Sequence, residues 1–157
     1  MTNGKTAPTA PWLSESEQHL WRSWLSVARR MDSALARDLQ RDTGLSMADY
    51  EVLVNLSEAP EHKMRMALLA DRLTWDRSRL SHQITRMMNR GLLAKETCNS
   101  DGRGAFVVLT DQGLSTIRDA APSHVASVRR LMFDVLSDEQ AETLDGILST
   151  LAGQFEE

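Results

Sequence analysis

The chain has 157 residues, of which 41% are hydrophobic and 25% are charged, and its formal net charge is −4. This length and balance suit one globular domain with a sizeable core and exclude a chain that is disordered throughout. The single cysteine, Cys98, excludes an internal disulfide framework and fits a reducing compartment. No stretch resembles a signal peptide and no apolar run of about 18 residues could span a membrane, so the sequence predicts a soluble cytoplasmic protein.

The charge is distributed unevenly along the chain. Residues 62–103 contain nine Lys and Arg against four Asp and Glu, whereas the remainder is strongly acidic. A basic segment in an acidic protein points to a polyanionic partner for that segment alone, with chance clustering as the alternative.

The N-terminal third of the sequence predicts an arm and two helices. Residues 1–13 are rich in Thr, Ala and Pro and are expected to form a flexible N-terminal arm. A capping box of Ser14 with Glu17 begins a long amphipathic helix that should end at Gly44. Its apolar side chains recur every three or four residues, at Leu20, Trp24, Ala28, Met31, Leu35 and Leu39.

A second helix is expected to begin at Ser46. Asp49 completes its capping box, while Leu45 and Tyr50 are placed to form a hydrophobic staple across its start. The helix should end before Pro60.

The middle of the chain predicts a helix-turn-helix. A short helix carries an apolar face, and Thr74, Trp75 and Asp76 then separate it from a helix over residues 77–90. Asp76 is a good N-cap and Gly91 a good C-terminal stop for that second helix. The face of the short helix consists of Met66, Leu69, Ala70 and Leu73.

The helix over residues 77–90 has two chemically different sides. At about 100° per residue, Leu80, Ile84 and Met87 fall on one side. Hydrogen-bonding groups and guanidinium groups make up the other side, and no carboxylate interrupts them. Such a face suits the major groove of DNA, where arginine bonds guanine bidentately and flanking groups contact phosphates. The predicted contacts from this helix are Arg77, Ser78, Arg79, Ser81, His82, Thr85 and Arg86.

Two extended segments, residues 92–98 and 105–109, follow this helix and enclose a turn with the sequence NSDGRG. Their composition predicts a two-stranded hairpin, which directly behind a helix-turn-helix is a wing. Arg103 would lie at the tip, within reach of an adjacent minor groove. A surface hairpin carrying a solvated arginine is the alternative.

The C-terminal part predicts two more helices. Thr110 caps the first, which Pro122 should interrupt and kink, and Ser137 with Gln140 forms the capping box of the second. These helices are more apolar than a domain of this size needs, so we expect them to pair with the helix over residues 14–42 of a second copy. The sequence thus predicts a mainly α fold, a single-domain chain with a winged helix-turn-helix over residues 46–110 between dimerisation helices at 14–45 and 111–157.

The chain resembles the MarR family of winged helix-turn-helix regulators. The resemblance rests on four segments and implies a homodimer that binds a pseudo-palindromic operator in double-stranded DNA, represses transcription and is released by a small molecule. It also implies that Arg103 and Asp101 act in the wing, where Asp101 would brace a nearby arginine. Thr74 and Trp75 depart from the family, in which glycine is common in the turn. We expect Trp75 to support the recognition helix and assign it no base-reading role. The four segments are LLADRL (68–73), RSRLSHQITRMMNRGLL (77–93), DGR (101–103) and LT..G (109–113).

Other candidate sites are weaker. Cys98 lies on a predicted wing strand, where an inert thiol is expected and a redox-responsive regulator is the alternative. The four histidines lack the spacing of zinc ligands. Trp12, Trp21 and Trp24 are interpreted as core residues, with an aromatic ligand pocket as the alternative. The sequence therefore assigns no metal, no cofactor and no position for the effector.

Two other functions compete with DNA binding. An enzyme is disfavoured because the sequence has no Gly-rich phosphate loop, no G-x-S-x-G and no H-E-x-x-H motif. A winged-helix module that binds protein has no need for a carboxylate-free polar face beside a basic wing tip. Steep dependence of binding on salt would distinguish DNA binding from that second alternative.

Overall fold

The computed structural model describes residues 11–97 and 104–156. It divides into two units, residues 1–34 and residues 35–157. Helix α1 (Glu15–Thr43) begins in the first unit and ends in the second. Ser14 and Glu17 form the predicted capping box, with 2.7 Å from the Ser14 N–H to Glu17 and 3.2 Å from the Glu17 N–H to the serine hydroxyl.

The first unit exposes its aromatic side chains. Trp12, Trp21 and Trp24 are 92%, 54% and 46% exposed, so their interpretation as core residues is wrong for a single copy of the chain. Leu20 and Val27 are exposed as well. Helical spacing of apolar residues does not by itself say whether the same chain covers them.

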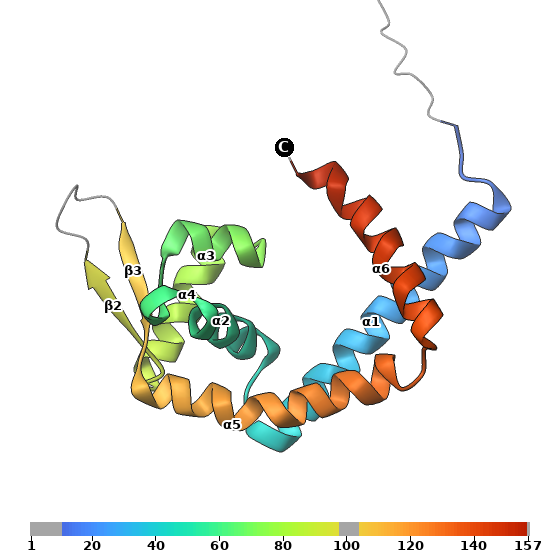
Figure 1. Cartoon of the computed structure of the whole chain (residues 1–157). Coiled ribbons are helices and arrows are strands. Elements are labelled where there is room, and N and C mark those ends of the chain that lie inside the picture. The colour runs from blue at the N-terminus through green and yellow to red at the C-terminus, as the bar shows by residue number, and fades with distance from the viewer. Residues whose placement is uncertain (1–10, 98–103, 157) are drawn as a thin grey trace, which may run out of the picture. The chain divides into compact units, whose positions relative to one another are not determined.

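The second unit is built around a compact group of helices and a small sheet (Figure 1). After α1 come α2 (Met47–Glu58), the short 3₁₀ helix η1 (Pro60–His62), β1 (Lys63–Arg65), α3 (Met66–Leu73) and α4 (Arg77–Asn89). Strands β2 (Leu93–Thr97) and β3 (Ala105–Leu109) lead to α5 (Asp111–Val128) and the π-helical turn η2 (Arg129–Phe133). The chain ends with α6 (Asp138–Ala152) and η3 (Gly153–Phe155).

The sheet has three antiparallel strands in the order β1-β3-β2. The predicted hairpin of β2 and β3 is present, with Leu93 opposite Leu109. The third strand was not predicted: β1 pairs with the other edge of β3, with Arg65 opposite Phe106. A three-residue strand is too short to show alternation in the sequence, and only its partner makes it a strand.

The predicted starts of α2, α5 and α6 and the predicted ends of α1 and α4 are confirmed, because they depend on short-range contacts. Ser46 and Ser137 form capping boxes, and the Thr110 side chain accepts the Gly113 N–H. Gly44 and Gly91 adopt φ of 74° and 78° where α1 and α4 end, a conformation that glycine tolerates best. Leu45 and Tyr50 are both buried, as the predicted staple requires.

Pro122 does not interrupt its helix, contrary to prediction. Helix α5 continues through it to Val128, and the irregular turn comes later, at Arg129–Phe133. Pro122 lies at an exposed position, where water can satisfy the carbonyl that its ring leaves without a donor.

The core of the second unit lies between α2, α3, α4 and the sheet. The predicted apolar side of α4 is fully buried there, with Leu80, Ile84 and Met87 each at 0% exposure. They pack with residues of the neighbouring helices and β3, including Leu53, Leu56, Leu69 and Val107. Burial of this side fixes which side of α4 faces solvent.

The end of α1 is joined to the end of α5 by a polar network. The carboxylate of Asp38 accepts hydrogen bonds from Ser127 at 2.9 Å and from the guanidinium groups of Arg41 and Arg130. Asp38 and Ser127 are both buried. This network fixes the last turns of α1 against the junction of α5 with η2.

Candidate nucleic-acid interface

The turn between α3 and α4 is held by backbone geometry. Thr74 adopts the left-handed conformation, with φ 54° and ψ 36°, which explains why glycine is favoured at this position. The N–H of Trp75 donates to the Ala70 carbonyl at 3.0 Å. The Asp76 carboxylate then accepts the N–H of Arg79 at 2.8 Å as the N-cap of α4.

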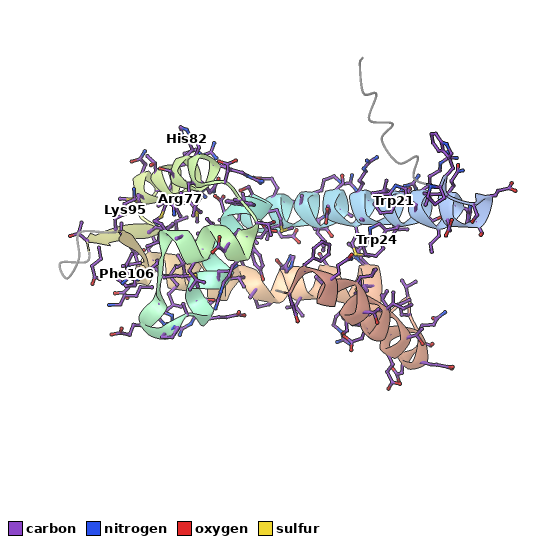
Figure 2. All side chains as sticks on the ribbon, turned by 90° about the horizontal axis from the view of Figure 1, so that it is seen from above. Trp21, Trp24, Arg77, His82, Lys95 and Phe106 are labelled. Carbon is purple, nitrogen blue, oxygen red and sulfur yellow. The ribbon has the colours of Figure 1, made fainter. Side chains whose placement is uncertain are left out.

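All seven side chains predicted to contact DNA from α4 are exposed. No residue of α4 is acidic, and the carboxylate that precedes the helix, Asp76, is its N-cap. Figure 2 shows Arg77 and His82 along α4, with His82 on the outer side of the helix. The seven exposed residues, which we call the α4 face, are Arg77, Ser78, Arg79, Ser81, His82, Thr85 and Arg86.

Arg79 is stacked on an aromatic ring. Its guanidinium carbon lies 4.1 Å from the centre of the Trp75 ring. Trp75 is itself partly buried and packs against the core. A cation over an indole ring is attracted by the ring quadrupole, so this stack restricts where the Arg79 side chain points. Sequence reasoning gave Trp75 no base-reading role, and the stack gives it a supporting one.

Two other residues of the α4 face make contacts within the helix. Thr85 donates its hydroxyl to the Ser81 carbonyl at 2.9 Å, and Arg86 donates to Oε1 of Gln83 at 2.8 Å. These bonds leave Arg86 with guanidinium N–H groups that can still donate, because the side chain carries five.

A buried carboxylate anchors α4 to α2. Asp49 accepts Nε2 of Gln83 at 2.7 Å on one oxygen, and Nη1 of Arg90 at 2.8 Å and the Ser46 N–H at 3.1 Å on the other. Burial alone raises the pKa of Asp49, but the hydrogen bonds from Arg90 and Ser46 outweigh it and hold that pKa below its usual value. Arg90 therefore joins helices and is not part of the α4 face.

Nothing in the sequence indicates this role of Gln83. A polar residue that follows the exposed His82 is ordinarily interpreted as surface, and the hydrogen-bond partner of Gln83 lies 34 residues away. Only the packing of α2 against α4 buries Gln83 at 5% exposure and supplies an acceptor.

The base of the wing carries two cations on one aromatic ring. Nζ of Lys63 lies 5.6 Å and the guanidinium carbon of Arg65 lies 5.1 Å from the centre of the Phe106 ring. Lys63 is also paired with Glu61 at 3.5 Å and Glu96 at 3.6 Å. The predicted wing-tip residues Asp101 and Arg103, and also Cys98, lie outside the described residues.

A cavity of about 630 Å³ opens beside the first turns of α4. It is lined by the β1–α3 junction, by α4 and by the start of β3. Two of the lining side chains, Arg65 and Arg77, are cationic, and none of the described lining residues carries a carboxylate. The lining residues are Arg65, Met66, Ala67, Arg77, Leu80, Ser81, Gly104 and Ala105.

His124 is a titratable residue that lies outside the α4 face. Its ring contacts the Tyr50 ring at a tilt of 41°, with 4.3 Å between ring centres, and burial lowers the pKa of His124. Within the described ranges, no group of three or more His, Cys, Asp and Glu side chains is placed to hold a metal. No helix in those ranges is both long and apolar enough to cross a bilayer.

Comparisons with known proteins agree with this geometry. Residues 34–120 match the family described as transcriptional regulator SarA/Rot. The chain is 49% identical to AbsC, a MarR family transcriptional regulator from Streptomyces coelicolor, over 93% of this chain and 98% of that one, with a TM-score of 0.87. It is 40% identical to Sco3205, a MarR family regulator of the same organism solved in complex with DNA, over 94% of this chain and 93% of that one, with a TM-score of 0.89.

A more distant relative belongs to the same class. The HTH-type transcriptional regulator MhqR of Bacillus subtilis is 23% identical over 99 residues, which are 63% of this chain and 66% of that protein. Identity of 40–49% over nearly the whole length, together with the shared fold, settles the family. The chain belongs to the MarR family of winged helix-turn-helix transcriptional regulators.

Proposed function

We propose that this protein is a homodimeric transcriptional repressor that binds a pseudo-palindromic operator in double-stranded DNA. Helix α4 would enter the major groove through its exposed face, and the wing would reach an adjacent minor groove through Arg103. The observation that carries the proposal is the α4 face itself. Seven exposed donors and hydroxyl groups without a carboxylate suit base edges and phosphates, and suit few other partners.

The stiffness of α4 supports the same function. Reading base edges requires side chains that start from a fixed backbone. Asp76 caps the start of α4, three buried apolar residues hold its inner side, and Asp49 joins it to α2 through Gln83 and Arg90.

The second copy is proposed from the apolar residues that the chain leaves exposed. No described residue of α6 is buried, although Ile147, Leu148 and Leu151 recur at helical spacing. Such a helix gains stability only if another surface covers it, and a second copy is the most common solution. Two copies would also place two α4 helices on half-sites about 34–36 Å apart. The dimer would then bind the operator far more tightly than one copy binds one half-site.

Repression and release by a small molecule are proposed from the family resemblance. We assign no residues to an effector site. A redox-responsive regulator using Cys98 remains the alternative for how the protein is controlled.

Selection of bound sequences from a random duplex pool tests the proposal. We expect recovery of an inverted repeat whose half-site centres lie about 10 base pairs apart. The affinity for the recovered site should fall linearly with salt on a log–log scale, with slope close to −0.9 for each phosphate contacted. Recovery of no sequence, or binding that ignores salt, would instead favour a module that binds protein.

A further inference from the structure

The C-terminal part of the chain is anchored up to Ser127 and no further. Within the described residues 128–156 every residue is exposed or only partly buried, although this stretch includes η2 and the whole of α6. Before that point, Ile117 and Ala120 anchor α5 in the core of the second unit. Ser127 is therefore the last buried point, from which η2 and α6 extend.

The carboxylate of Asp38 lies at this last buried point. Its Oδ2 accepts the Ser127 hydroxyl at 2.9 Å and Nη2 of Arg130, while its Oδ1 accepts Nη1 of Arg41 at 2.9 Å. Ser127 belongs to the last regular turn of α5 and Arg130 to η2, so one carboxylate binds residues on both sides of the boundary between them. The hydrogen bond from Ser127 is the main reason that the pKa of Asp38 lies below its usual value, which keeps the carboxylate charged for its two guanidinium partners.

The boundary that Asp38 spans is where the helix changes its geometry. The N–H of Asp134 donates to the carbonyl of Arg129 at 2.8 Å, which is a bond across five residues in place of the usual four. Turns of this kind are rare, occur frequently at functional positions and are places where helices bend. The bond from Arg130 to Asp38 therefore holds the turn at which the chain could most easily change direction.

Asp38 is itself fixed by the core beneath α4. Its neighbour Leu39 is 1% exposed and belongs to the same cluster of buried residues as Leu80, Ile84 and Met87. Those three residues hold the inner side of α4 and thereby orient the α4 face. Asp38 thus links the part of the chain that carries the α4 face to η2 and α6, in which no described residue is buried.

We propose that Asp38 is a positioning residue that fixes the spacing at which two copies of the chain bind their half-sites. The inference rests on the proposed function, in which α6 packs against the second copy and α4 enters the major groove. Helix α6 has 15 residues and is about 22 Å long. A change of about 10° in the direction of such a helix moves its far end by about 4 Å, which is close to the rise of one base pair, about 3.4 Å. A small movement at Asp38 is therefore enough to change the separation of the two α4 helices by one base pair.

The test compares duplexes that carry the selected half-site twice at different separations. The distance between the half-site centres is changed by one base pair in either direction, and a duplex with a single half-site is included. For the wild type we expect binding to weaken about tenfold at each changed separation, as it would if one base contact were lost. Asp38→Asn and Arg130→Ala should reduce that preference to about threefold or less, because the loss of one hydrogen bond shifts an equilibrium by about threefold or more. Base preference within the half-site, and affinity for the single half-site, should not change, because neither residue belongs to the α4 face.

Matched variants separate positioning from stability. Asp42→Asn removes a carboxylate that lies 2.7 Å from Nε of Arg41 at an exposed position on the same helix end, and it should keep the wild-type preference. Arg130→Lys keeps a positive charge beside Asp38 and should restore most of the preference that Arg130→Ala loses. Arg130→Ala leaves Asp38 bonded to Ser127 and Arg41, so it provides the measurement if Asp38→Asn does not fold. Urea unfolding and sedimentation establish that each variant is folded and dimeric at the concentration of the assay.

The spacing preference distinguishes this role from a purely structural one. If Asp38→Asn and Arg130→Ala lose affinity by the same factor at every separation, the network only stabilises the fold and the positioning role is wrong, while the proposed function stands. The positioning role is also wrong if the wild type binds all separations alike, or if the variants lose their preference because they become monomers. If the wild-type protein binds no duplex, the proposed function fails and the positioning role fails with it.

Discussion

Replacing Asp49 by asparagine should disconnect α4 from α2. The carboxylate accepts three hydrogen bonds, one on the oxygen facing Gln83 and two on the oxygen facing Arg90 and the Ser46 N–H. An asparagine can keep the bond to Gln83 through its carbonyl oxygen. Its NH₂ group then faces two donors, so the other two bonds are lost.

The structure sets the size of the effect. A hydrogen bond to a buried charged group contributes about 1.5–3 kcal/mol, and the Arg90 partner is 44% exposed, which places its bond at the low end. Adding the capping bond from Ser46 gives an expected loss of about 2–4 kcal/mol in the free energy of unfolding. For a chain of this length that corresponds to a fall of about 5–15 °C in Tm.

The effect should also depend on pH in a defined direction. The pKa of Asp49 is lower in the folded state than in the unfolded state, so its carboxylate stabilises the fold above the unfolded pKa of about 3.9. That stabilisation is lost as the pH falls through the folded pKa. The difference between wild type and Asp49→Asn should therefore be constant from about pH 5 to 7 and shrink below about pH 4.

Urea unfolding at matched protein concentration, repeated from pH 3 to pH 7, measures both quantities. Asp119→Asn is the control, because it removes a carboxylate from an exposed position on α5 and should change stability by less than about 0.5 kcal/mol. If Asp49→Asn is as stable as the control, the hydrogen bonds of Asp49 do not stabilise the fold as described. A destabilisation of equal size at every pH would refute the part that depends on charge.

Three further outcomes follow from the proposed function. Arg79→Ala should lose about 1–3 kcal/mol of discrimination at one base pair per half-site, as measured by repeated duplex selection. Trp75→Leu should reproduce part of that loss, whereas Trp75→Phe should retain more of the discrimination. An unchanged base preference in both Trp75 variants would show that the stack is incidental. Arg103→Ala should weaken all duplexes alike and lower the salt slope by about 0.9, and an unchanged slope would remove it from the wing contacts. Replacing Ile147 and Leu151 together by glutamate should dissociate the dimer in sedimentation experiments without unfolding the protomer, since both are already exposed; a mass unchanged from that of the wild type would contradict the proposed role of α6.

Features that depend on neighbours in the sequence were predicted from the sequence alone. Each N-cap side chain accepts a hydrogen bond from the backbone N–H three residues later, so the helix starts depend on near neighbours in the sequence. These N-caps are Ser46, Asp76 and Ser137. The ends of α1 and α4 require a glycine that tolerates positive φ. The buried side of α4 follows from the 3.6-residue period, and it leaves the α4 face exposed.

Features that depend on distant partners were decided only by the tertiary structure. Strand β1 exists because β3 has an edge free for it, and Gln83 is buried because Asp49 accepts its amide. Packing also places two arginines of the basic segment in different surroundings. Arg90 joins α4 to α2 through Asp49, whereas Arg65 lies over the Phe106 ring and lines the cavity. The sequence specifies the charge of each arginine. Which group each guanidinium contacts depends on how helices and strands pack, because the partners lie tens of residues apart in the sequence.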